Sequence, residues 1–123
     1  MKDAIGDIAE KLRRFAEERD WDQFHSPKNL AMAMTVEVAE LLEHFQWLTE
    51  EQSNHLSPEK KALVAEEIAD IQIYLILMAD KLGIDIHDSV RGKMRQNEKK
   101  YPTDRVRGDA RKYTEYHDRQ ENQ

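Results

Sequence analysis

VEVAELLEHFQW, at residues 36–47, and its shorter counterpart EEIADIQIY, at residues 66–74, are apolar stretches that each carry an acidic edge. Each stretch places two carboxylates three residues apart, and the four residues are Glu37, Glu40, Glu67 and Asp70. At about 100° per residue, both carboxylates of a pair lie on one edge of a helix, which His44 and Tyr74 extend. Ionised carboxylates held together in a partly dry site repel one another, so a divalent cation is expected among them.

The rest of the chain has the spacing and the end signals of helices. Apolar residues recur every three to four positions from Ile5 to Ala16. Ser26-Pro27 and Ser57-Pro58 each pair an N-cap with a first-turn proline, and Gly83 is placed to end a helix. Four main helices are expected, at residues 3–19, 27–48, 58–82 and 85–101, with a capping box that opens a short turn at residues 49–52.

These helices predict an all-α fold, because no strand-like alternation of useful length interrupts them. The helix expected at residues 58–82 is apolar almost all round, so it requires burial on more than one side. Four helices of one small chain provide too little cover for it. We therefore expect a helical bundle completed by oligomerisation, as a homodimer or a homotetramer.

The composition restricts the class of protein. With 123 residues, 39% apolar and 36% charged, the chain has the size of one domain with a moderate core. It has no cysteine for disulfides or thiolate ligands, no membrane-length apolar run and no signal-peptide core, so a cytoplasmic location without a membrane partner is expected. The net charge of -6 argues against binding to a nucleic-acid polymer.

The four carboxylates converge if the helices at residues 27–48 and 58–82 pack antiparallel, as their short connection favours. Oxygen ligands in this number suit Mg²⁺, with Mn²⁺ as the other candidate, because both ions keep waters and accept phosphate oxygens. Glu43 and Glu66 lie beside the pairs but point less directly at the same space.

The spacing alone does not establish a metal site. Acids three residues apart also occur at Asp7 and Glu10, Glu17 and Asp20, Asp85 and Asp88, and Glu115 and Asp118, where solvated helix faces or turns explain them. The double occurrence inside the two most apolar helices favours the metal. An iron-binding bundle would require Glu-x-x-His pairs, which the chain lacks, and it also lacks a P-loop and a Rossmann glycine run.

Several further motifs follow in order along residues 13–116. They are ERDWDQFH at residues 18–25, Phe45-Gln46-Trp47, Lys93-Met94 followed by Asn97 and Tyr101-Pro102, and RKYTE at residues 111–115. Together with the two carboxylate pairs, these motifs resemble the MazG-like all-α NTP pyrophosphatases, with the dCTP pyrophosphatase branch as the best match. The order and spacing of the motifs are much more specific than the acid pairs alone.

The resemblance implies a Mg²⁺-dependent hydrolysis of a deoxynucleoside triphosphate, most of all dCTP or a modified dCTP, between the α- and β-phosphates. The products would be the nucleoside monophosphate and pyrophosphate. Glu37, Glu40, Glu67 and Asp70 match the family's metal ligands and are therefore the expected catalytic residues. The same machinery acting on dUTP or a noncanonical nucleotide is the first alternative. A non-catalytic helical adaptor that dimerises and binds partners through its tryptophans is an alternative of another class.

The resemblance also implies a substrate-binding set. Trp21 and Trp47 match aromatics that sandwich the base, and His25 lies where it would read a base edge or line the base pocket. The residues expected at the sugar and the phosphates are Tyr74, Lys93, Asn97, Lys100, Tyr101 and Arg111. Residues 1–102 would then form the hydrolase domain and residues 103–123 a polar tail, with a lid over the active site as one alternative and loose surface as the other.

Overall fold

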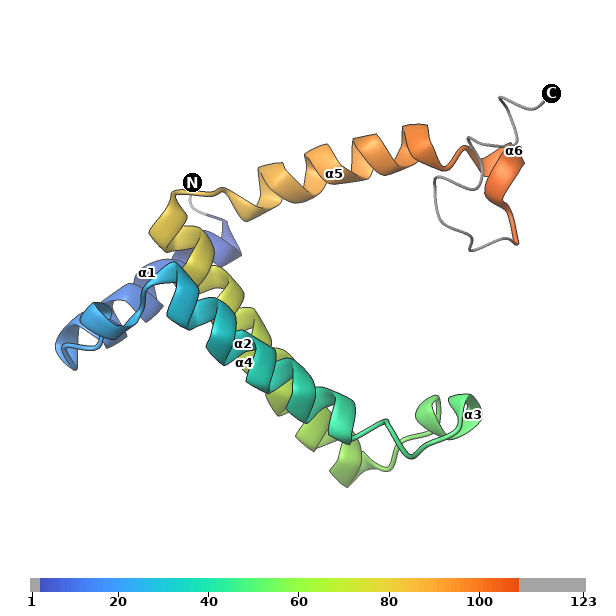
Figure 1. The fold of residues 1–123 in the computed structure, drawn as a ribbon, viewed down its shortest axis with the longest axis horizontal. Helices are drawn as coiled ribbons and strands as arrows, with labels where there is room; N and C mark the ends of the chain where they lie inside the picture. The colour runs from blue at the N-terminus through green and yellow to red at the C-terminus, as the bar shows by residue number, and fades with distance from the viewer. Residues whose placement is uncertain (1–2, 109–123) are drawn as a thin grey trace. The chain divides into compact units, whose positions relative to one another are not determined.

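The computed structural model describes residues 3–108 of the chain and confirms the predicted all-α class. In order, its elements are α1 (Ala4–Glu18), the 3₁₀ turn η1 (Asp22–Phe24), α2 (Pro27–Glu43), α3 (Glu50–Ser53), α4 (Pro58–Leu82), α5 (Ile86–Lys100) and α6 (Thr103–Val106) (Figure 1). The chain divides into two compact units, the first ending at Asp85 and the second beginning at Ile86. The predicted functional division after residue 102 stays a prediction.

The helix starts follow the capping signals in the sequence. The Ser26 Oγ accepts a hydrogen bond from the Asn29 N–H at 3.1 Å, and the Ser57 Oγ accepts one from the Lys60 N–H at 3.2 Å. A proline follows each serine and fits the first turn, where no intrahelical N–H bond is needed. At the other end of α4, Gly83 takes the left-handed conformation with φ of 66°, which ends the helix as predicted.

The prediction for the end of α2 was wrong by five residues. The helix ends at Glu43 and not at Leu48. The chain then tightens, because the N–H groups of His44, Phe45 and Leu48 bond to carbonyls only three residues earlier. No Gly or Pro marks this change, and the apolar periodicity continues past the end of the helix. The sequence pattern therefore predicts a longer helix than the structure has. The short helix α6, which lies just after Pro102, was not predicted either.

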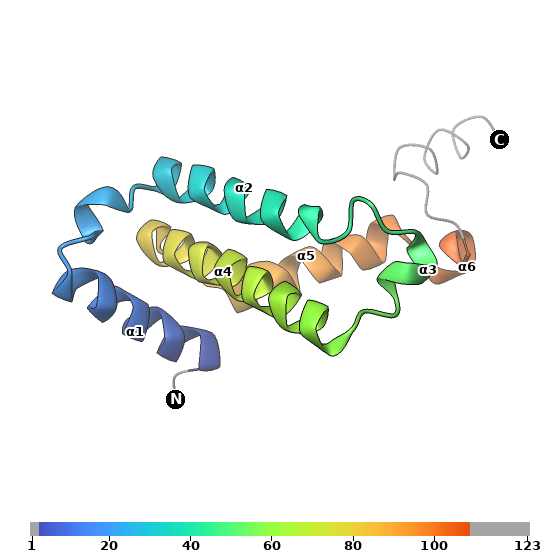
Figure 2. The same ribbon diagram turned by 90° about the horizontal axis from the view of Figure 1, so that it is seen from below.

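In the first unit, α4 lies between α1 and α2 and packs against both (Figure 2). The α2 helix runs along α4 in the opposite direction, because His44 lies near Glu67 whereas Glu37, earlier in α2, lies near Asp70, later in α4. This is the antiparallel arrangement that the short connection predicted, and it brings the two acidic edges face to face.

The core of this unit is small. Among the described residues, the buried apolar side chains are Ala16, Leu30, Val64, Ile76 and Ala79. Large apolar side chains on both α2 and α4, such as Val36 and Ile68, stay more than half exposed in the single chain. The first unit by itself therefore leaves apolar faces of α2 and α4 open, and the predicted oligomerisation stays a prediction. Among residues 3–108, no helix has both the length and the hydropathy of a membrane span.

Candidate metal centre and adjoining pocket

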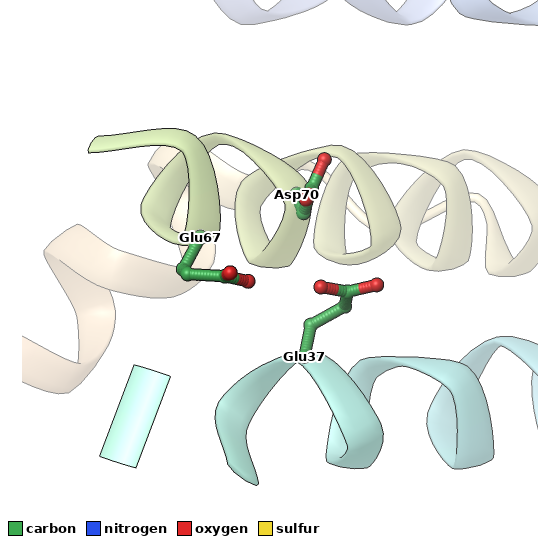
Figure 3. A group of neighbouring side chains, drawn as sticks. All are labelled: Glu37, Glu67 and Asp70. Carbon is green, nitrogen blue, oxygen red and sulfur yellow. The ribbon is translucent and has the colours of Figure 1, made fainter. Parts of the chain in front are cut away.

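Three carboxylates from two helices meet between α2 and α4. Each of Glu37, Glu67 and Asp70 offers one oxygen atom, and these three atoms all lie within 4.8 Å of one another. Glu37 points from α2 toward α4, and Glu67 reaches from α4 into the space between the helices (Figure 3). Because the helices run antiparallel, acids three positions apart on α4 can face a single acid on α2. The geometry fits a small cation bound among them.

The electrostatics of this cluster also fit a cation. Burial is the main cause that raises the pKa of Glu37 from 4.5 to about 7, and the nearby carboxylates of Glu40, Asp70 and Glu67 raise it further. The Glu37 Oε2 and Glu67 Oε2 atoms are buried, and neither has a hydrogen-bond partner within the described part of the chain. Buried carboxylate oxygens without a donor cost folding free energy, which a bound metal ion would offset.

Glu40 and His44 lie at the margin of this cluster. Glu40 is not one of the three carboxylates that converge, but it lies close enough to Glu37 to be the largest cause of its raised pKa after burial. The His44 Nε2 lies 3.8 Å from the Glu67 Oε1, and the two side chains are only 18% and 17% exposed. The three convergent carboxylates are thus the ones best placed to bind a metal, with Glu40 next to them.

An apolar pocket of about 300 Å³ adjoins the carboxylates. Its walls come from α1, from the joint at residues 20–25 and from α4, and the lining residues are Leu12, Phe15, Ala16, Trp21, His25, Asp70, Ile73, Tyr74 and Leu77. Asp70 belongs both to this lining and to the metal-binding cluster. Three residues that the sequence assigned to substrate, Trp21, His25 and Tyr74, are therefore gathered beside one of the predicted metal ligands.

The Trp21 ring stands against α1. It meets Phe15 edge to face, with ring centroids 5.7 Å apart and an interplanar angle of 70°. The guanidinium carbon of Arg19 lies 3.6 Å from the centroid of the Phe15 ring, which places a cation on that ring as well. Phe15 is thus a wall of the pocket. Sequence reasoning missed it, together with Leu12, Ile73 and Leu77, because a helix face that lines a pocket has the same apolar spacing as one that fills a core.

The structure does not bring Trp47 to this pocket. Trp21 precedes the first residue of α2, whereas Trp47 follows its last, and a helix of 17 residues is about 25 Å long. The Trp47 side chain is 86% exposed. Lys93, Asn97, Lys100 and Tyr101 lie in or just after α5, in the second unit, and their predicted roles stay predictions. Arg111 lies outside the described residues.

Comparisons with known proteins show what this chain is similar to. The sequence model described as the MazG-like family matches residues 32–116. The chain is 43% identical over 113 residues to dCTP pyrophosphatase 1 of Bos taurus and 42% identical over 113 residues to that of Homo sapiens. These matches cover 90% of the chain in both cases, and 67% and 66% of the relatives, so the chain spans about two thirds of their length.

A solved structure is similar as well. The crystal structure of a pyrophosphatase from Archaeoglobus fulgidus DSM 4304 aligns with a TM-score of 0.77 and 40% sequence identity. The alignment covers 83% of this chain and 95% of the archaeal one. At this identity and coverage, the likeness extends beyond a shared helical topology.

Proposed function

We propose dCTP or a modified dCTP as the substrate of this chain, which belongs to the dCTP pyrophosphatase branch of the MazG-like family. Membership of that branch makes the chain a dNTP pyrophosphohydrolase. We infer cleavage between the α- and β-phosphates, which yields the nucleoside monophosphate and pyrophosphate. Enzymes of this family depend on a metal, and Mg²⁺ is the ion that we propose, with Mn²⁺ as a substitute. The cytoplasmic location predicted from the sequence is part of the same proposal.

One observation supports this function most directly, namely the contact between the carboxylate cluster and the aromatic pocket through Asp70. A nucleotide has a triphosphate at one end and a flat ring at the other, so it requires two such sites side by side. Glu37, Glu67 and Asp70, with Glu40 beside them, are the residues that would hold the metal. When bound, the metal neutralises charge on phosphate oxygens and activates water for attack on phosphorus.

The pocket suits a base because it is apolar and aromatic with a few polar groups at its edge. Trp21 presents a ring for stacking, and His25 has ring nitrogens that can read the edge of a base. Tyr74 lies one helical turn after Asp70 and lines the same pocket, which supports its proposed contact to the sugar. These are the roles that the sequence motifs predicted, and the shared pocket lining supports them as proposals.

The exposed Trp47 would complete the pocket of a second copy. A sandwich of one base between Trp21 and Trp47 of the same chain is not compatible with their positions at opposite ends of α2. A homodimer or homotetramer that buries the apolar faces of α2 and α4 can carry Trp47 of one chain to the pocket of another. Lys93, Asn97, Lys100, Tyr101 and Arg111 remain proposed contacts to the sugar and the phosphates.

The base is the part of the proposal with a second candidate. An apolar pocket with one stacking face holds any pyrimidine, so dUTP or a noncanonical nucleotide is the alternative substrate of the same machinery. The comparisons do not support the non-catalytic adaptor. The relatives of similar sequence are named dCTP pyrophosphatases, and the similar solved structure is that of a pyrophosphatase.

The test is a panel of dNTPs and NTPs with Mg²⁺, scored for pyrophosphate and monophosphate. We expect dCTP or a 5-substituted dCTP to give the highest kcat/KM and pyrophosphate to be the first phosphate product.

Asp70→Asn should lower turnover about 100-fold or more while the helical circular dichroism stays the same, because a neutral amide is a poor ligand for Mg²⁺. Glu66→Gln, one exposed carboxylate on the same helix outside the cluster, is the matched control. Orthophosphate as the first product would contradict α,β cleavage.

A further inference from the structure

The last turn of α4 carries two neighbouring residues of opposite charge that contact different parts of the chain. Asp80 accepts hydrogen bonds from Arg13 of α1, with the Arg13 Nε 3.0 Å from Oδ2 and the Nη2 2.5 Å from Oδ1. Lys81, the next residue, donates from its Nζ to the Oδ1 of Asp22 in η1. One turn of one helix therefore holds both α1 and the joint at residues 20–25.

Few other contacts hold the joint at residues 20–25 against the rest of the first unit. None of the three residues of η1 is buried. Most of its hydrogen bonds are local, such as those from the Gln23 side chain to the carbonyl and carboxylate of Asp20, whose φ is 52°. The Asn29 side chain donates to the Phe24 carbonyl at 3.0 Å and so ties the end of η1 to α2. Across to α4, which forms the opposite wall of the pocket, the joint makes the ion pair of Asp22 and Lys81.

The position of the joint decides the shape of the pocket. Trp21 directly precedes Asp22 and His25 follows it by three, and both line the pocket. On the far wall, Ile73 and Leu77 belong to the same helix as Lys81. Asp22 and Trp21 are joined by a peptide bond, so a movement of Asp22 away from α4 would displace the Trp21 backbone, even though the Trp21 N–H bonds to the Ala16 carbonyl at 2.9 Å and its ring contacts Phe15, both on α1.

We propose that Lys81 is a positioning residue, which through its ion pair with Asp22 holds the segment Trp21–His25 against α4 and so sets the affinity of the pocket for the base. Lys81 does not line the pocket, so it acts through Asp22 and not by touching the nucleotide. This inference rests on the proposed function in one respect, namely that a base occupies the pocket. The hold of Lys81 on the joint does not depend on any substrate.

The charges support this arrangement. The hydrogen bond from Lys81 is the main cause that lowers the pKa of Asp22, so the pair is ionised throughout the neutral range. The two side chains are 30% and 57% exposed, and ion pairs at this exposure contribute modestly. We therefore expect loss of the pair to change ligand affinity about fivefold, and not to unfold the protein.

The first experiment compares the steady-state kinetics of Lys81→Met with those of the unmodified enzyme. We expect KM for the preferred dNTP to rise about fivefold while kcat stays within about twofold, because the metal-binding carboxylates are untouched. Lys81→Arg should keep most of the affinity, and the exchange of the two charges in Asp22→Lys with Lys81→Asp should recover part of it. Lys11→Met, which breaks the exposed pair of Lys11 and Asp7 on α1, is the matched control and should leave KM unchanged. An unchanged KM in Lys81→Met would overturn the proposal.

A second measurement needs no turnover. The chain has two tryptophans, so Trp47→Phe leaves Trp21 as the reporter of the joint. In that background, without nucleotide, Lys81→Met should shift the Trp21 emission to the red and increase its quenching by acrylamide. A raised KM with unchanged quenching would mean that Lys81 acts on the substrate by charge, which also overturns the positioning role. Unmodified protein that hydrolyses no nucleotide would refute the proposed function, while the quenching result would still decide whether Lys81 holds the joint.

Discussion

Glu37 is the residue whose protonation should govern the behaviour of the site near neutral pH. Its carboxyl has a usual pKa of 4.5 and a pKa of about 7 in the folded chain. Between these values the folded state binds a proton that the unfolded state has already lost. The free energy of unfolding of the metal-free protein therefore falls as the pH rises from about 4.5 to about 7, and the loss is complete above that range.

This gives a prediction for thermal unfolding in the presence of a chelator. The Tm of the metal-free protein should fall from pH 5 to pH 8, and Glu37→Gln, which cannot ionise, should reduce that fall. Mg²⁺ or Mn²⁺ should restore Tm most at the upper end of the range, where Glu37 is deprotonated and free to bind the ion. Glu66→Gln serves as the control and should keep the slope of the unmodified protein. Equal slopes for Glu37→Gln and Glu66→Gln would contradict the assignment.

At the level of single residues, the sequence allowed the carboxylates of the cluster to be predicted better than the apolar walls of the pocket. Glu37, Glu67 and Asp70 stand out because charge inside an apolar helix is costly and thus conspicuous. Phe15 and Leu77 do not stand out, because an apolar side chain in a pocket wall looks the same as one in a core. Whether such a residue meets a neighbour or an empty space depends on the packing of three separate segments, which no local pattern contains.

Among the elements, α4 ends at a glycine whose backbone is left-handed. Gly83 has φ of 66°, and an added Cβ would meet no atom within 4 Å. Gly83→Ala should therefore lower the free energy of unfolding by about 1 kcal/mol through backbone strain alone, since nothing blocks the methyl group. Urea denaturation measures the change.

Gly92→Ala is the matched control for that substitution. Gly92 lies inside α5 with helical backbone, and its Cβ would come no closer than 3.8 Å to the Arg95 side chain. The same chemical change should here raise the free energy of unfolding by up to about 1 kcal/mol, because alanine loses less backbone entropy than glycine in a helix. Destabilisation of similar size at both positions would show that the left-handed conformation is not the cause.

The ends of the helices could be predicted where a side chain or a ring imposes them. Ser26-Pro27, Ser57-Pro58 and Gly83 each act through one local hydrogen bond or one dihedral angle, so the sequence is sufficient. The end of α2 at Glu43 could not be predicted in this way. There the helix tightens into turns with no capping residue, and its end is set by the contacts around residues 44–48 and not by their own preferences.

At the scale of the whole molecule, the first unit by itself leaves large apolar side chains of α2 and α4 exposed. On α4, Ile68 and Leu75 are 55% and 40% exposed and lie seven residues apart, on one face. We expect sedimentation at micromolar concentration to show a dimer or a tetramer. Ile68→Glu with Leu75→Glu should shift the protein toward the monomer, because two buried charges without partners weaken an apolar interface.

The control for that experiment places a charge change elsewhere. Glu18→Lys, at an exposed polar position near the end of α1, should leave the mass unchanged. If Trp47 of one chain completes the pocket of another, the monomeric variant should also lose affinity for the nucleotide. A protein that sediments as a monomer without any substitution would refute the predicted assembly.

The sequence was sufficient for the all-α class of the molecule, because helix class depends on periodicity that each segment carries by itself. It was also sufficient to predict that the longest helix requires cover on more than one side. The sequence was not sufficient to predict which surfaces pack against that helix. These contacts depend on surfaces far apart in the sequence, and within the first unit α1 and α2 leave the face of α4 at Ile68 and Leu75 open.

Asp70 stands in two environments at once, facing the other carboxylates on one side and the aromatic pocket on the other. A residue shared in this way makes the binding of the ion and the binding of the ring thermodynamically reciprocal. Whatever factor a bound nucleobase applies to the affinity for the metal, the metal must apply the same factor to the affinity for the nucleobase. The part of base discrimination that depends on the metal can therefore be measured by titrating the metal in the presence of different nucleosides, which have no phosphate to cleave.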